Sequence, residues 1–159
     1  MSFLDLLTPE RVRADLVAAD KTELLAEIAT LLAGDQGDEE EINQALQARE
    51  DLGSTGLGHG VAIPHGRIEE TGQVRAVFIK LQTPLEFDAL DAEPVDLVAA
   101  LVVPTGFADQ HLLLLAELAE MFSDRQLTAD LREAGDASAV IAKLAEFKRK
   151  STGESAWTD

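Results

Sequence analysis

Two of the three histidines and five of the eleven glycines fall within residues 53–66, which read GSTGLGHGVAIPHG. Backbone N–H groups in a glycine-rich loop can surround an anion. The apolar run 61–63 predicts the end of a short strand, which leads to Pro64 and His65. Because a neutral imidazole nitrogen is nucleophilic near pH 7, we interpret His65 as an exposed side chain that could carry a phosphoryl group. A histidine merely packed at a strand end is the alternative, but simple packing does not need these glycines.

Two further side chains could hold the phosphoryl oxygens. Arg49 lies just before the glycine-rich segment, and the planar guanidinium group suits phosphate oxygens. It could equally neutralise a helix end or pair with Glu50 or Asp51. His111 lies in the first turn of an expected helix that follows a buried strand, where anions are favoured. Since four leucines follow it, a structural role is equally open.

Hydroxyl groups inside the glycine-rich segment are also candidates. Ser54 and Thr55 could bind a phosphoryl oxygen, although such residues more often stabilise a turn. We interpret His59 as a loop residue near the rim of the site. The segment lacks the G-K-S/T of a nucleotide-binding P-loop, and it precedes a strand, whereas a dinucleotide fingerprint follows one.

Composition excludes several other classes of protein. There are no cysteines, so disulfides and thiolate chemistry are excluded. The histidine spacings match no zinc motif, and no G-x-S-x-G elbow is present, so we expect neither a metal nor another cofactor. A net charge of -17 disfavours nucleic acid and would attract a basic protein partner, or it serves solubility. Without a long apolar stretch or a signal peptide, we expect no membrane insertion and a cytoplasmic protein.

The chain alternates between patterns typical of strands and of helices. Capping signals at Asp20, Asp38 and Asp136 mark expected helix starts. A nearly continuous apolar run predicts a central strand covered on both faces. The expected strands cover residues 12–17, 61–63, 74–81 and 95–103, and the expected helices cover residues 20–33, 38–50, 109–122, 127–133 and 136–145.

This alternation predicts an α/β fold, a three-layer α/β/α sandwich around a mixed sheet. We expect one domain over residues 1–150 and a disordered tail over residues 151–159.

The run from Arg49 to Gly66, REDLGSTGLGHGVAIPHG, resembles the signature of the enzyme IIA domain of the bacterial phosphoenolpyruvate-dependent phosphotransferase system, fructose/mannitol type. The resemblance extends over roughly residues 3–147. It includes Thr83-Pro84-Leu85, the acidic stretch 88–91, Pro94-Val95 and the pair His111-Leu112 before a helix.

The resemblance implies a mixed five-stranded sheet flanked by helices and a phosphoryl relay. A phosphorylated histidine carrier protein, HPr or its nitrogen-branch relative, would donate to His65, with Arg49 and His111 as supporting site residues. No nucleotide and no dedicated metal would take part. The group would then pass to a IIB protein during sugar uptake, or its presence would control regulated proteins.

Within the family, the chain is most similar to the nitrogen-regulatory IIA branch. The run Pro64-His65-Gly66-Arg67-Ile68 followed by two acids resembles that branch, and we expect a single domain with no attached IIB or IIC segment. His59 and the strong acidity depart from the pattern expected of that branch. The implied function is a phosphoryl-relay protein whose phosphorylation state regulates partners, with a sugar-specific IIA component as the alternative.

Overall fold

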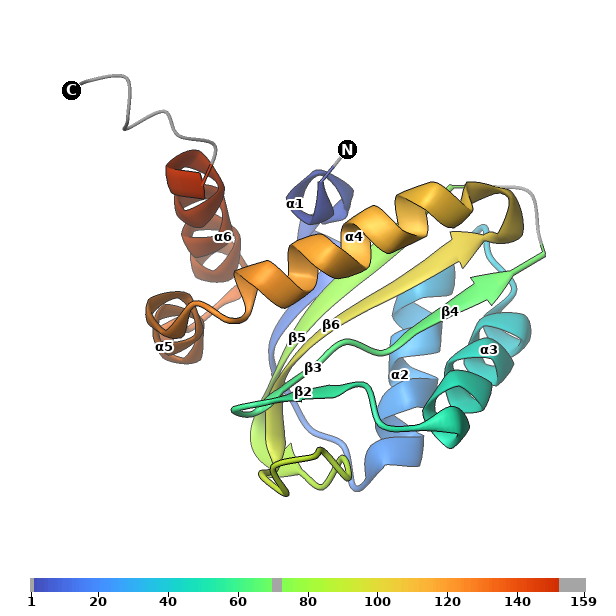
Figure 1. The fold of residues 1–159 in the computed structure, drawn as a ribbon, viewed down its shortest axis with the longest axis horizontal. Helices are drawn as coiled ribbons and strands as arrows, with labels where there is room; N and C mark the ends of the chain where they lie inside the picture. Colours follow the sequence, from blue (N-terminus) through green and yellow to red (C-terminus); the bar gives the residue numbers. More distant parts are fainter. Residues whose placement is uncertain (1, 70–72, 152–159) are drawn as a thin grey trace.

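A mixed sheet forms the middle layer of the computed structural model, which describes residues 2–69 and 73–151 (Figure 1). Its order is β1-β5-β6-β3-β2, and β4 also pairs with β6. The β5–β6 and β2–β3 pairs are antiparallel, whereas β1–β5, β3–β6 and β4–β6 are parallel. The strands are β1 Val12–Leu16, β2 Gly56–Gly58, β3 Val61–Ala62, β4 His65–Ile68, β5 Arg75–Leu85 and β6 Val95–Pro104.

Helices cover both faces of this sheet, as the sequence predicts for a three-layer α/β/α fold. Side chains of α2 and α3 form one buried cluster against the sheet, and side chains of α1, α4, α5 and α6 form the other. The helices are α1 Phe3–Leu6, α2 Lys21–Ala33, α3 Glu39–Leu52, α4 Ala108–Met121, α5 Arg125–Glu133 and α6 Ala137–Ser151, with short 3-10 turns at Pro9–Arg11 and Thr105–Phe107.

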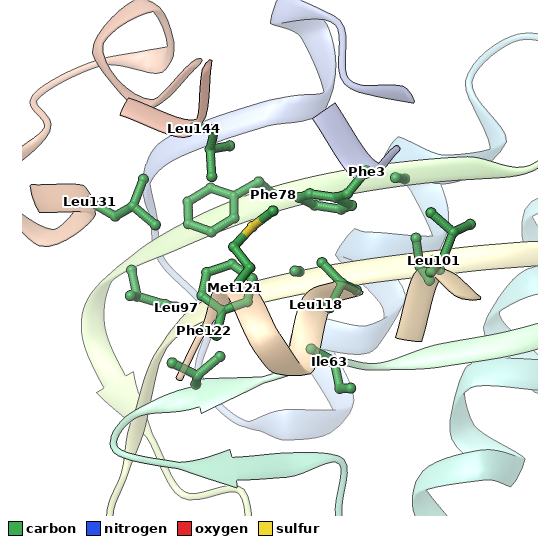
Figure 2. Close-up of a cluster of buried hydrophobic side chains, with 14 of the residues drawn as sticks. Phe3, Ile63, Phe78, Leu97, Leu101, Leu118, Met121, Phe122, Leu131 and Leu144 are labelled. Atoms are coloured by element: carbon green, nitrogen blue, oxygen red, sulfur yellow. The ribbon is translucent and has the colours of Figure 1, made fainter. Parts of the chain in front are cut away.

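Strand β6 is the central strand that its apolar run predicts. Successive side chains of a strand point to opposite faces. Leu97, Ala99 and Leu101 therefore join the cluster under α4, α5 and α6, where Phe78 stacks on Phe122 (Figure 2). Val98, Ala100 and Val102 join the cluster under α2 and α3. Burial on both faces explains why this strand lacks polar alternation.

The capping signals place α2 and α3 where the sequence predicts them. The Asp20 carboxylate accepts a hydrogen bond from the Glu23 N–H, and the Asp38 carboxylate accepts one from the Glu41 N–H. These caps satisfy N–H groups that a first helical turn otherwise leaves unpaired. Since α3 continues to Leu52, Arg49 lies in its last turn.

The sheet has six strands where the family resemblance implies five, because one strand position is divided. β3 pairs with Leu97 and Val98, and β4 resumes on the same side of β6 at Leu101. Pro64 lies between them and has no N–H to donate to the sheet. The strand expected over residues 61–63 ends at Ala62, just before Pro64 and His65, and His65 then begins a further strand, β4, that the sequence did not predict.

The glycine-rich segment is more ordered than the open loop expected from the sequence. Residues 56–58 form β2, which returns antiparallel to β3 through His59 (φ 57°) and Gly60 (φ 83°). Positive φ at both central residues is typical of the tightest hairpin turns. The segment therefore forms a β-hairpin, and several of its N–H groups bond to side chains: Thr55 to the Glu50 carboxylate, Gly56 to the Ser54 hydroxyl and His59 to the Asp91 carboxylate.

The C-terminal helix is longer than expected, since α6 reaches Ser151. The expected disordered tail over residues 151–159 otherwise lies outside the described residues. Within residues 2–69 and 73–151, no helix is both long and apolar enough to cross a membrane.

Gly66 controls how closely α3 approaches β4. A Cβ built on Gly66 would lie 2.9 Å from the Ala45 Cβ and 3.1 Å from the Ala45 carbonyl carbon. Gly66→Ala should therefore lower the free energy of unfolding by about 1–3 kcal/mol, because overpacking forces the helix away. Urea denaturation measures this loss. Gly106→Ala is the control, since no atom lies within 4 Å of its added Cβ; equal stability of the two variants would contradict the close packing.

Candidate active site

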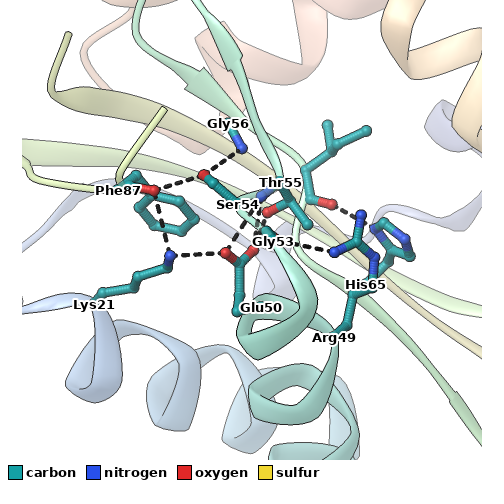
Figure 3. A network of polar contacts seen from close by, with 10 residues as sticks. Lys21, Arg49, Glu50, Gly53, Ser54, Thr55, Gly56, His65 and Phe87 are labelled. Carbon is teal, nitrogen blue, oxygen red and sulfur yellow. Dashed lines mark hydrogen bonds and ion pairs between the residues drawn. The ribbon is translucent and has the colours of Figure 1, made fainter. Parts of the chain in front are cut away.

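His65 lies at the beginning of β4, between helices that belong to opposite faces of the sheet. Its ring packs edge to face against His111 of α4, with 5.3 Å between the ring centroids and 72° between the planes. On its other side it lies beside Arg49 of α3 (Figure 3). The side chain is only 8% exposed, so the expectation of an exposed imidazole is wrong. Its position between α3 and α4 explains this, and its neighbours are polar.

A backbone carbonyl fixes the proton of His65. The ring Nδ1 lies 2.8 Å from the Ile63 carbonyl oxygen. A carbonyl oxygen can only accept a hydrogen bond, so Nδ1 must carry the proton. The lone pair of the neutral ring is therefore on Nε2, which makes this nitrogen the nucleophilic atom.

Burial lowers the pKa of His65 below its ordinary value of 6.5, which favours the neutral ring. The Ile63 hydrogen bond and the charge of Glu50 raise that pKa, and the charge of Arg49 lowers it further. The net shift is downward, and the Nε2 lone pair is thus available at neutral pH.

Arg49 combines two of the roles that the sequence left open. Its Nη1 donates to the carbonyl oxygen of Gly53 at 2.8 Å, which ties the end of α3 to the following loop. The same side chain influences the pKa of His65. Arg49 is therefore both a helix-end cation and a neighbour of the imidazole.

His111 lies in the first turn of α4 and is 6% exposed. Its Nδ1 accepts a hydrogen bond from Arg67 Nε at 3.2 Å. Its Nε2 is buried without a hydrogen-bond partner among the described residues. Burial, followed by the charges of His65 and Arg67, lowers the pKa of His111 to about 4. The ring is neutral at pH 7 and has one N–H that no atom of residues 2–69 and 73–151 accepts.

Ser54 and Thr55 use their hydroxyl protons inside the protein (Figure 3). The Ser54 hydroxyl donates to the Phe87 carbonyl oxygen at 2.5 Å and accepts from the Gly56 N–H at 3.0 Å. The Thr55 hydroxyl and N–H both donate to the carboxylate of Glu50. Turn stabilisation is therefore the role seen here, and their contact with phosphate stays a prediction.

Glu50 and Lys21 form a buried ion pair that the sequence did not reveal. Their Nζ and Oε2 atoms lie 2.8 Å apart, with 4% of the Glu50 side chain exposed. Lys21 also donates to the carbonyl oxygen of Phe87 at 3.3 Å and lies over its ring, 4.6 Å from the centroid. The pair joins the start of α2 to the end of α3. Through their other hydrogen bonds, Glu50 also holds the loop that contains Thr55, and Lys21 holds the loop that contains Phe87. The adjacency of Glu50 to Arg49 was visible in the sequence, but its burial was not.

His59 lies apart from this site, in the exposed turn of the β2–β3 hairpin. A cleft of about 470 Å³ beside it is also lined by Asp91, Asp96, Arg125 and Arg132. Neither His65 nor His111 contributes to that cleft. In the part of the chain that the structure describes, no group of three or more His, Asp or Glu side chains could hold a metal ion.

Comparison with known proteins gives the same family as the sequence resemblance. Residues 5–147 match the family described as phosphoenolpyruvate-dependent sugar phosphotransferase system, EIIA 2. A nitrogen regulatory protein of Bradyrhizobium diazoefficiens is 36% identical over 146 residues, which cover 91% of this chain and 95% of the relative. One of Pseudomonas aeruginosa is 39% identical over 137 residues, covering 85% and 89%.

A solved structure extends this likeness to three dimensions. The crystal structure of the nitrogen regulatory protein IIA-Ntr of Neisseria meningitidis has a TM-score of 0.84 at 37% identity, covering 89% of this chain and 97% of that one.

The structure places a histidine pair beside β4 of a mixed sheet that lies between helical layers, and the family match makes this a phosphotransferase domain. The chain belongs to the EIIA 2 family of the phosphoenolpyruvate-dependent sugar phosphotransferase system, and its function is phosphoryl relay.

The Glu50 carboxylate should stabilise the loop at residues 53–56. Glu50→Gln removes the charge that Lys21 and the Thr55 donors share. It should lower the free energy of unfolding by about 1–3 kcal/mol, the range for a buried hydrogen bond to a charged group. Denaturation in urea measures the change, with the exposed Glu120→Gln as control. Equal stability of the two variants would contradict the role of Glu50.

Stability should depend on pH through His111. The unfolded ring takes a proton near pH 6.5, whereas the folded ring stays neutral down to about pH 4. Between these values the unfolded state binds more protons, so stability falls as pH falls. The wild-type protein should lose on the order of 1–3 kcal/mol relative to His111→Gln between pH 7 and pH 4.

Denaturation at both pH values measures this difference, and an NMR titration gives the midpoint of His111 directly. A midpoint near 6.5 would refute the burial effect.

Proposed function

We propose that His65 accepts the phosphoryl group on Nε2 from a phosphorylated histidine carrier protein, HPr or its nitrogen-branch relative. The hydrogen bond between His65 Nδ1 and the Ile63 carbonyl is the single observation that carries this proposal. It leaves Nε2 as the nitrogen with a lone pair, and the lowered pKa of His65 keeps that lone pair free of a proton.

The transfer is an in-line displacement between two imidazoles. The Nε2 lone pair of His65 forms the new N–P bond as the donor's N–P bond breaks, and the bonding electrons return to the donor nitrogen. No proton has to leave His65, because Nδ1 keeps its own. The positive charge that develops on the His65 ring is stabilised by the Ile63 carbonyl oxygen 2.8 Å away. Transfer between similar nitrogens is nearly reversible, as a relay needs.

Arg49 and His111 supply positive charge and an N–H for the phosphoryl oxygens. The transferred group resembles metaphosphate, so positioning and electrostatics account for most of the catalysis. Arg49 contributes a fixed charge beside His65, and the His111 Nε2–H is a buried donor without an acceptor in the part of the chain that the structure describes. Ser54 and Thr55 could bind phosphate only if each hydroxyl left its present acceptor.

A regulatory role is supported by the relatives, which are named nitrogen regulatory proteins. Phosphorylation adds about 1.5–2 negative charges at pH 7 to a chain whose net charge is already -17. The added charge repels an acidic partner face and favours a basic one. We therefore infer that residues 1–150 act as one cytoplasmic domain whose phosphorylation state regulates partner proteins.

A sugar-specific role is the second candidate, because the family's own description names a sugar phosphotransferase system. In this role the phosphoryl group passes from His65 to a IIB protein. The two roles are separated by incubating the radiolabelled phosphoprotein with fructose- and mannitol-type IIB proteins. Rapid loss of label to IIB supports sugar uptake, whereas retained label supports regulation.

The acceptor role is tested by reconstitution with phosphoenolpyruvate and the two upstream proteins of the system. The wild-type protein should gain the mass of one phosphoryl group, and His65→Ala should gain none. His59→Ala is the matched control, because His59 lies in the hairpin turn away from the site, and it should gain the group normally. Intact mass with site mapping reads the outcome; a label on any residue other than His65 refutes the assignment.

A further inference from the structure

Arg67 lies two residues after His65 in β4, so both side chains leave the strand on the same side. His111 of α4 lies on that side and contacts both residues. Its ring packs against His65 with a centroid separation of 5.3 Å, and its Nδ1 accepts from Arg67 Nε at 3.2 Å. Arg67 is thus linked to the site by its hydrogen bond to His111.

The chemistry of a guanidinium group fixes the proton of His111. Arginine has five N–H donors, has no acceptor and does not lose its charge in proteins. The His111 Nδ1 must therefore be an acceptor when it bonds to Arg67. In the neutral ring the single proton is then on Nε2, the atom that is buried and unpartnered among the described residues. A lysine could donate there too, but as a mobile point charge without a fixed plane.

An unpartnered buried donor destabilises the resting protein. Leaving a buried polar group without a partner is unfavourable, because the group has lost its hydrogen bonds to water. A phosphoryl oxygen is a strong acceptor, and its arrival beside the histidine pair would satisfy this N–H. The hydrogen bond from His111 Nε2–H then forms only when the phosphoryl group is present. Such a bond stabilises the phosphoryl group in the site and gives the empty site no stabilisation.

We infer that Arg67 is a positioning residue for phosphoryl transfer, which holds the His111 ring by its Nδ1 and thereby presents the His111 Nε2–H to the phosphoryl group on His65. This inference rests on the proposed function. Burial and the charges of His65 and Arg67 keep His111 neutral down to about pH 4, as its lowered pKa indicates. The donor therefore stays in the same protonation state throughout the neutral range.

Arg67→Met removes the donor and the charge but keeps a long side chain. We expect about a tenfold or larger loss in the rate of phosphorylation, the range for removing a partner that orients a site histidine. Arg67→Lys should restore part of the rate. Arg13→Met is the matched control, because it removes an equal charge from an exposed position on β1 at the other edge of the sheet.

Nitrogen-15 NMR of labelled histidine supplies a readout that a general loss of stability does not change. In the wild-type protein, His111 should show a protonated Nε2 and an acceptor Nδ1. In Arg67→Met the His111 ring should become a mixture of its two neutral tautomers. The pKa of His111 should also rise, because a neighbouring positive charge is gone.

A double-mutant cycle decides whether Arg67 acts through His111. If it does, Arg67→Met should have no further effect on the rate in a His111→Ala background. Additive losses would mean that Arg67 touches the phosphoryl group itself and would overturn the inference. An unchanged rate and unchanged His111 signals in Arg67→Met would overturn it as well. Failure of the wild-type protein to label at His65 would instead refute the proposed function.

Discussion

One short hydrogen bond, from the imidazole Nδ1 of His65 to the carbonyl oxygen of Ile63, organises the site. The pairing with β6 stops after Ala62 and resumes at Pro64, whose carbonyl oxygen accepts from the Leu101 N–H at 3.1 Å, so Ile63 lies in the gap. The Ile63 N–H donates to the Thr55 carbonyl oxygen, and the Ile63 carbonyl oxygen accepts from the ring of His65, two residues later. The break in one strand thus provides an acceptor that fixes which nitrogen of His65 is nucleophilic.

The groups around His65 come from both helical layers. Arg49 belongs to α3 and His111 belongs to α4, and these helices cover opposite faces of the sheet. They can meet one side chain because β4 pairs only with β6 among the described strands, so no further strand lies between the two helical layers there. The fold therefore builds the site at an edge, where a partner protein could approach without opening the core.

Local patterns in the sequence predicted much of this arrangement. The Asp20 and Asp38 caps, the apolar run of β6 and the position of His111 in a first helical turn are all set by neighbouring residues. The family resemblance added Arg49 and His111 as the side chains that act with His65. The hairpin turn at His59-Gly60 was missed, although a pair of residues suited to positive φ between short β segments is a readable signal.

What could not be predicted depends on contacts between distant residues. Glu50 is charged and buried because Lys21, 29 positions earlier, pairs with it, and no local pattern reports that burial. The bond from Arg67 to His111 joins residues 44 positions apart. The burial of His65 likewise depends on side chains distant in the sequence, Arg49 of α3 and His111 of α4.

The central claim is that the Ile63 carbonyl leaves Nε2 of His65 as the atom that bonds to phosphorus. Phosphorus–nitrogen coupling, measured by NMR on the phosphorylated protein with labelled histidine, tests it most directly. The phosphorus should couple to Nε2 of His65, while Nδ1 of the same ring keeps its proton. Phosphorus attached to Nδ1 of that ring would contradict it.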